Sequence, residues 1–325
     1  MTNNVKSLIY PMPDMMTSQR RGKSLTRRPL KKLIFVYPKR KLFLSLAAIA
    51  LILSAEVSTS APGENALDFL NLPVGANSAA LGQGGYAGII GPEAIFGNPS
   101  LLGNTAFFAS HQELLLDTRA EAFALASNLG EGFTLGFGAL LFSPGQITGY
   151  SAENSRTGTI DAGDRVVRLA VSKAGRISWG VSASYYHQRL DTQMGNGLGA
   201  GVGISIETQT GRFSLTADNL GPPFTVESLS APLPARFSSS GWVPLFNPAV
   251  SLSLDLSYRN SVGITGCAGL EYRPLDGFQL RAGSNNLESV ALGLGLSRKN
   301  VSLDYSYVPQ DDFGDRHIFS LILAK

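Results

Sequence analysis

The residue types that could carry chemistry are few and widely scattered in this sequence. The histidines, His111, His187 and His317, are far apart, and none has a second ligand at a metal-binding spacing. The single cysteine, Cys267, can form neither an internal disulfide nor a four-cysteine zinc site. No serine lies in a Gly-x-Ser-x-Gly elbow. We therefore predict a protein that is not an enzyme, with no catalytic residue, no metal site and no cofactor.

Two further motifs have a functional and an ordinary interpretation. The acidic stretch at residues 311–315 could bind calcium, but it lacks EF-hand spacing, and a solvated loop rich in turn-forming residues is the default. The stretch at 81–85 lacks the GxGxxG spacing and follows no clear strand, so a nucleotide-binding loop is disfavoured.

The charge of the chain is distributed unevenly. It has 27 Lys and Arg against 24 Asp and Glu. Eleven of the basic and two of the acidic residues precede residue 62, so the remainder has 16 basic and 22 acidic residues, a net charge of −6. A nucleic-acid partner, which would require a basic face, is therefore disfavoured, and we predict none.

The first 61 residues have the order of a secretory signal peptide. A basic region covers 20–41, an apolar run covers 42–55, and small or polar residues follow at 58–61. The apolar run is shorter than the ~20 residues of a transmembrane helix. We predict that 1–61 is a cleavable signal segment that directs export from the cytoplasm.

After about residue 104, apolar and polar residues alternate with a period of two. The clearest example is 250–258, where Val250, Leu252, Leu254 and Leu256 alternate with serines and Asp255. Strict alternation of this kind indicates strands with one apolar and one polar face. Most predicted strands run to 8–12 residues, whereas globular strands average about five to six and membrane-spanning strands need about nine to eleven.

The pattern predicts about fourteen such strands, at 104–111, 119–128, 131–142, 164–173, 176–189, 197–208, 211–219, 234–243, 249–259, 263–273, 276–283, 287–297, 300–308 and 315–324. Every long predicted connection follows an odd-numbered strand, so all of them lie at the same end of the sheet. They are at 143–163, 190–196, 220–233 and 309–314. An antiparallel barrel in the outer membrane has short turns at one end and long loops at the other. The sequence therefore predicts an all-β transmembrane barrel over 104–325, with a soluble β-sandwich or solenoid as the alternative.

The polar face of these strands would line the barrel interior. Eight charged residues are predicted to face the lumen: Arg168, Glu207, Asp218, Arg236, Asp255, Glu271, Arg281 and Asp304. A selective pore would more often have one sign of charge along its wall, so mixed signs favour salt bridges that hold a plug or fill the lumen.

Residues 62–103 do not alternate, and we predict that this compact, glycine-rich segment is a plug inside the barrel. Its motifs are Phe69-Leu70-Asn-Leu-Pro73-Val-Gly75, Ala79-Ala-Leu-Gly82 and Asn98-Pro99-Ser-Leu-Leu102. They resemble the opening of the PorV/PorQ family, which is related to the FadL-type outer-membrane barrels. The resemblance extends over about 66–321 and implies a fourteen-stranded barrel with an N-terminal plug.

The resemblance implies two alternative roles for such a barrel in the outer membrane of a Gram-negative type of bacterium. In PorV/PorQ relatives the barrel belongs to the type IX secretion system, so the expected partners are secretion-machinery subunits or cargo proteins. In FadL-type relatives the barrel is a gated passage for hydrophobic small molecules, so a hydrophobic ligand is the alternative partner. In both cases the barrel would contact outer-membrane lipid.

Overall fold

The computed structural model describes residues 65–325 except 146, 246–248, 261, 287–289 and 311–313. The predicted signal segment and part of the acidic loop lie outside these residues. Among the residues described, no helix is long and apolar enough to cross a membrane.

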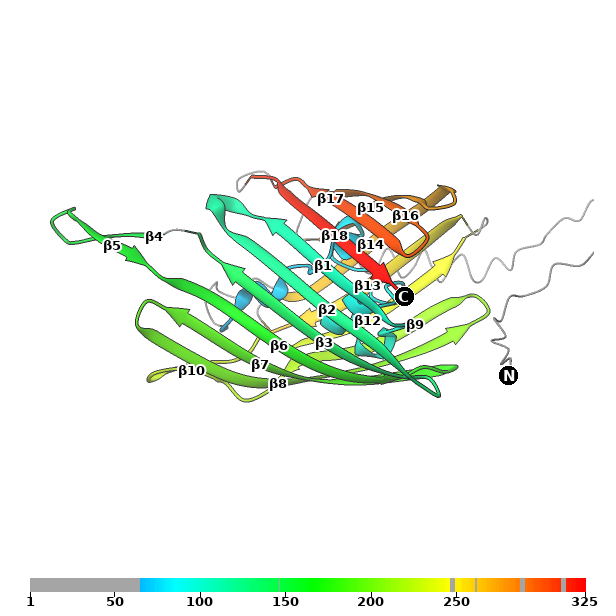
Figure 1. Ribbon diagram of the computed structural model, residues 1–325, viewed down its shortest axis with the longest axis horizontal. Coiled ribbons are helices and arrows are strands. Elements are labelled where there is room, and N and C mark those ends of the chain that lie inside the picture. The colour runs from blue at the N-terminus through cyan, green and yellow to red at the C-terminus, as the bar shows by residue number, and fades with distance from the viewer. Residues whose placement is uncertain (1–64, 146, 246–248, 261, 287–289, 311–313) are drawn as a thin grey trace, which may run out of the picture. The chain divides into compact units, whose positions relative to one another are not determined.

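The described chain forms a closed antiparallel barrel of fourteen strands (Figure 1). Each strand pairs with its neighbour in the chain, β1 pairs with β18, and β8 pairs with β9, so the ring has no free edge. The barrel strands are β1 (Ala106–Glu113), β2 (Arg119–Gly130), β3 (Phe133–Ser143), β6 (Ala162–Lys173), β7 (Ile177–Leu190), β8 (Gln193–Thr208), β9 (Gly211–Leu220), β12 (Arg236–Pro244), β13 (Val250–Arg259), β14 (Gly263–Leu275), β15 (Phe278–Asn285), β16 (Ala291–Arg298), β17 (Val301–Val308) and β18 (Arg316–Ala324). The predicted fold class and strand number are confirmed.

The alternation of the sequence becomes an inner and an outer face. In β13, Ser251, Ser253 and Asp255 are buried toward the lumen, whereas Leu256 and Tyr258 are exposed on the outside. Because lipid cannot satisfy backbone hydrogen bonds, a sheet that crosses a bilayer must be closed, and its outer face must be apolar. The barrel meets both conditions.

The two ends of the barrel differ. At one end, which we call the short-turn end, β2–β3, β8–β9, β14–β15 and β16–β17 are each joined by two residues. The other, the long-loop end, carries the connections 144–161, 221–235 and 309–315.

The two longest connections each contain a hairpin. β4 (Ile147–Tyr150) pairs with β5 (Arg156–Ile160), and β10 (Phe224–Val226) pairs with β11 (Leu229–Ala231). In Figure 1 the β4–β5 hairpin extends beyond the barrel strands.

The structure also corrects one strand boundary. β8 begins at Gln193 rather than at 197, because β7 and β8 continue to pair up to Leu190 and Gln193 across a tight turn in which Asp191 has φ 56°. Glycines at 195, 197 and 199 remove the apolar alternation there, so the early part of the strand has no sequence signal.

Five short helical turns precede or follow the first strand. They are η1 (Asp68–Asn71), α2 (Ala76–Ala80), η2 (Pro92–Phe96) and η3 (Pro99–Leu101) before β1, and η4 (Leu115–Asp117) lies between β1 and β2. The first four belong to the predicted plug.

Candidate functional site: the packed lumen

The plug, residues 65–103, runs through the lumen from one end to the other. At the long-loop end, the Ala66 amide donates to the Pro232 carbonyl at 3.0 Å, and the Phe69 ring stacks on Phe142 with centroids 5.2 Å apart. Near the short-turn end, the Thr134 hydroxyl donates to the Gly103 carbonyl at 2.8 Å. The segment therefore contacts the wall near both ends of the lumen.

One side of the lumen, formed by β1, β2, β3 and β6, carries many apolar inward side chains beside the polar Ser110, Gln112 and Arg168. Its inward side chains are buried against the plug, and they include Phe108, Ala122, Ala124, Leu140 and Val166. From the plug, Leu67, Phe69, Ile95 and Leu102 join the same cluster. We call this continuous cluster the apolar lane.

The opposite side, formed by β9 and β12 to β18, is lined by serines and charged side chains. Its serines are buried and inward-facing: Ser214, Ser238, Ser240, Ser251, Ser253, Ser257, Ser306 and Ser320. The lumen is thus richer in apolar side chains on one side and in serines and charged side chains on the other.

The first charge cluster centres on Asp218. Its Oδ2 lies 3.0 Å from Nη1 of Arg168 and 3.5 Å from Nη2 of Arg236, and all three side chains are buried. Arg168 also donates to the Ile95 carbonyl and Arg236 to the Phe96 carbonyl, at 3.0 and 3.2 Å. The two guanidinium groups therefore link the wall to the last residues of η2.

The second charge cluster centres on Arg281. Its Nε donates to Oε2 of Glu271 at 2.7 Å, and its Nη1 donates to Oδ1 of Asp304 at 2.5 Å. The second contact passes over Gly295 of β16, where a β-carbon would lie 2.5 Å from the Asp304 carboxylate. A side chain at that position would break the bridge.

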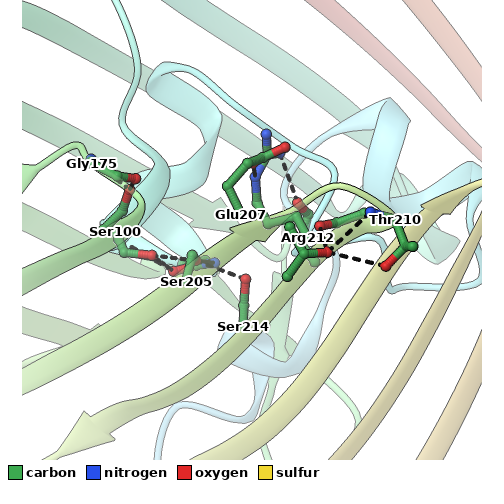
Figure 2. A network of polar contacts seen from close by, with 12 residues as sticks. Ser100, Gly175, Ser205, Glu207, Thr210, Arg212 and Ser214 are labelled. Atoms are coloured by element: carbon green, nitrogen blue, oxygen red, sulfur yellow. Dashed lines mark hydrogen bonds and ion pairs between the residues drawn. The ribbon is translucent and has the colours of Figure 1, made fainter.

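The Asn98-Pro99-Ser100 turn is held by hydroxyl groups of the wall. The Ser100 hydroxyl lies 2.6 Å from that of Ser205 on β8, which lies 2.7 Å from that of Ser214 on β9 (Figure 2). The Asn98 amide donates to the Ser205 hydroxyl at 3.1 Å. A β-carbon at Gly180 would lie 2.3 Å from the Pro99 carbonyl oxygen, so the wall is shaped to receive this turn.

The other plug motif residues are also in contact with the wall. Pro73 is fully buried, and its carbonyl accepts a hydrogen bond from Gln112. Gly82 has φ +75°, and a β-carbon there would lie 2.5 Å from the Ser284 carbonyl oxygen. Leu70 is partly buried against the apolar lane, and Gly75 lies against the Glu93 carboxylate.

The remaining predicted lumen residues lie in different surroundings. Asp255 is buried and accepts the Gly85 amide at 2.7 Å. Glu207 has the inward parity of Ser205, but it lies at the short-turn end, where its side chain is 49 % exposed and pairs with Arg212 at 2.6 Å (Figure 2). The prediction that Glu207 faces the lumen interior is therefore wrong, because the strand has left the enclosed lumen at this point.

The histidines lie near strand ends with polar neighbours. His111 is 3.6 Å from Glu121, His187 is 2.9 Å from Asn196, and His317 is 2.9 Å from the Tyr305 hydroxyl. Within the part of the chain that the structure describes, no group of three potential metal ligands comes together.

Two residues that the sequence pattern does not reveal are central to the lumen. Phe224, from the β10–β11 hairpin, is buried at the long-loop end, where a β-carbon at Gly195 or Gly197 would lie 2.7 Å from its ring. Glu93 lies in η2, and burial raises the pKa of its carboxyl group to about 7. It lines a cavity of about 20 Å³ together with Leu72, Tyr86 and Arg236. The short motif around Glu93 gives no hint of these contacts.

Comparisons with known proteins identify the architecture. No protein-family model and no curated protein sequence matches the chain. Among solved structures, the CymD monoaromatic hydrocarbon channel is 14 % identical, with a TM-score of 0.55 over 78 % of this chain and 98 % of the other. Its fold is that of the FadL-type outer-membrane barrels. A TodX monoaromatic hydrocarbon channel mutant is 11 % identical, with a TM-score of 0.50 over 76 % and 97 % of the two chains.

Proposed function

We propose that this protein is an outer-membrane channel for small apolar molecules, closed by its own plug. The observation that carries the proposal is the apolar lane, which extends from Phe69 at the long-loop end to Leu102 and Phe108 near the short-turn end. A route of this kind favours apolar solutes, because ions would lose their hydration without new partners. The channels with the similar fold are described as passing monoaromatic hydrocarbons, which agrees with such a lane.

The lane is filled in this structure, so transport requires the plug to move. The cavity between plug and wall, about 20 Å³, has room for about one water molecule. Buried contacts on both halves of the lumen hold the plug, and we infer that the charged wall residues are plug-holding groups rather than a selectivity filter.

The lane can be tested with a matched pair of tryptophan substitutions on β2. Ala124 faces the lane and is fully buried, whereas the adjacent Leu125 faces outward and is 52 % exposed. We expect Ala124→Trp to reduce uptake of radiolabelled toluene by proteoliposomes several-fold and Leu125→Trp to leave it unchanged. Heat-modifiable migration on a gel checks that each variant forms the barrel, and Ala122→Asn provides a smaller obstruction if Ala124→Trp does not. Equal uptake by folded inward and outward variants would contradict the proposal.

The resemblance of the motifs at 69–75 and 98–102 to the PorV/PorQ family favours a second candidate, a docking barrel in type IX secretion. Purification from the native membrane distinguishes the two candidates. If secretion subunits co-purify with the barrel and the purified protein takes up no toluene, the docking role is supported. In either case we propose that residues 1–61 are a cleaved signal segment, which sequencing the N-terminus of the membrane-bound protein would test.

A further inference from the structure

Glu93 is a buried carboxylate that has, among the described residues, too few hydrogen-bond partners and no close positive charge to stabilise its ionised form. Its side chain is 6 % exposed, and among the described contacts its Oε1 has no hydrogen-bond partner. A β-carbon at Gly75 would lie 2.2 Å from that oxygen, so the group is pressed against the plug backbone. Ser78 provides hydrogen bonds that favour the ionised form.

The charged groups around Glu93 do not neutralise it. Asp304 of β17 repels its negative charge, and Arg281 of β15 attracts it, but Arg281 is already shared between Asp304 and Glu271. On the other side of the cavity, Arg236 pairs with Asp218 and also donates to the Tyr86 hydroxyl, at 3.1 Å. Among the described ion pairs none includes Glu93, so its ionised form is buried without a close counter-ion.

The position of Glu93 makes its charge matter for the whole plug. It lies in η2, two residues before Ile95, and the Ile95 and Phe96 carbonyls accept hydrogen bonds from Arg168 and Arg236. It also contacts Ser78 of α2 and Gly75 at the start of that helix. A charge at this point therefore acts on both helical parts of the plug at once. An unpaired charge buried in a protein interior costs far more than the neutral acid.

We propose that Glu93 is a proton-controlled latch: neutral Glu93 keeps residues 75–97 packed in the lumen, and ionised Glu93 loosens them.

The direction follows from the two protonation equilibria. Burial, with a further contribution from Asp304, raises the pKa of Glu93 from 4.5 to about 7 in the packed state. An acid whose pKa is raised by packing holds its proton more tightly when packed, so packing is favoured at low pH and weakens as pH rises from 4.5 to about 7. If the loosened state restores the pKa of 4.5, the equilibrium for loosening increases about 30-fold between pH 5.5 and 8.5.

Hydrogen–deuterium exchange of the full-length protein in detergent micelles tests the latch. After correction for the intrinsic pH dependence of exchange, we expect wild-type peptides covering 75–97 to open about 30-fold more at pH 8.5 than at pH 5.5. Glu93→Gln should be insensitive to pH and, as a permanently neutral group, about ten-fold more protected than the wild type at pH 5.5. Glu113→Gln, on the exposed end of β1, is the matched control and should behave as the wild type.

The outcomes separate clearly. Wild-type exchange that is flat across this pH range, or a Glu93→Gln variant that keeps the wild-type pH response, would overturn the proposal. Because Glu93→Gln could fail to insert, Ser78→Ala gives a second test. It removes the hydroxyl hydrogen bond to the ionised form and keeps the backbone one, so the transition should move to higher pH, and an unmoved transition contradicts the latch. The measurement involves no transport, so it tests the latch separately from the proposed channel. A plug that responds to pH in a protein that takes up no toluene would support the latch and contradict the channel function.

Discussion

Arg168 on β6 and Asp218 on β9 form an ion pair of 3.0 Å across the two intervening strands. The contact is possible because Gly201 of β8 has no side chain: a β-carbon there would lie 2.7 Å from the Asp218 carboxylate. The same guanidinium donates to the Ile95 carbonyl of the plug. A single buried carboxylate therefore organises both the wall and the plug.

Removing this carboxylate charge should destabilise the barrel. Asp218→Asn leaves Arg168 and Arg236 buried without their counter-ion, and breaking a buried pair costs about 3–5 kcal/mol. We expect a lower midpoint of heat modification on gels. Glu207→Gln removes one member of a half-exposed pair and should cost less than about 1 kcal/mol. Similar midpoints for the two variants would show that the Asp218 cluster adds no more stability than a surface ion pair.

Phe224 should hold the β10–β11 hairpin in the long-loop mouth. The hairpin meets β8 through two residue pairs, Thr225 with Asn196 and Val226 with Gly195. Replacing a buried phenylalanine by alanine costs about 3–5 kcal/mol of stability. A hairpin with so few other contacts should no longer stay packed against the barrel after this loss. We expect Phe224→Ala to make residues 221–235 sensitive to protease, whereas Leu229→Ala, at an exposed position of the same hairpin, should remain resistant. Protection that persists in Phe224→Ala would show that other contacts secure the hairpin.

A methyl group on the wall should displace the plug. In Gly180→Ala the new β-carbon would overlap the Pro99 carbonyl oxygen, and neither backbone can yield without moving the Asn98–Ser100 turn. We expect increased ion conductance in planar bilayers and faster amide exchange at 95–102. Gly241→Ala is the control, since its β-carbon would make ordinary contacts of 3.5 Å with Phe213. Unchanged conductance in a folded Gly180→Ala barrel would mean that the turn does not seal the passage.

Tethering the plug should stop transport reversibly. A β-carbon at Gly84 would lie 3.0 Å from that of Cys267, and a shift of about 0.5–1 Å would give the spacing of a disulfide. Because Cys267 is the single cysteine, Gly84→Cys can form one specific cross-link on oxidation. We expect toluene uptake to fall when this variant is oxidised and to recover on reduction. Gly84→Ser, which cannot cross-link, should not respond to oxidant; a tethered protein with full uptake would show that the lane opens without movement at residue 84.

The sequence alone determined the barrel and the direction of its side chains. Side chains on a strand alternate with a period of two, so the serines and Asp255 of β13 had to face opposite to its leucines, and the lengths of the strands and the phase of the loops indicated closure. These are local properties, and they need no knowledge of partners. The segment at 62–103 stood apart because it does not alternate, which led to the prediction of a plug.

What each inward residue does was decided by the tertiary structure. Asp218 and Glu207 share a residue type and a predicted direction, yet one joins two arginines to the plug and the other lies half-exposed at the short-turn end. Glu93 lies in an ordinary turn of the sequence, but its surroundings include Gly75, Ser78 and the charge of Asp304, the last more than two hundred residues away. Electrostatic free energies depend on distance and burial in space, and only the closed barrel with its plug in place brings these groups together.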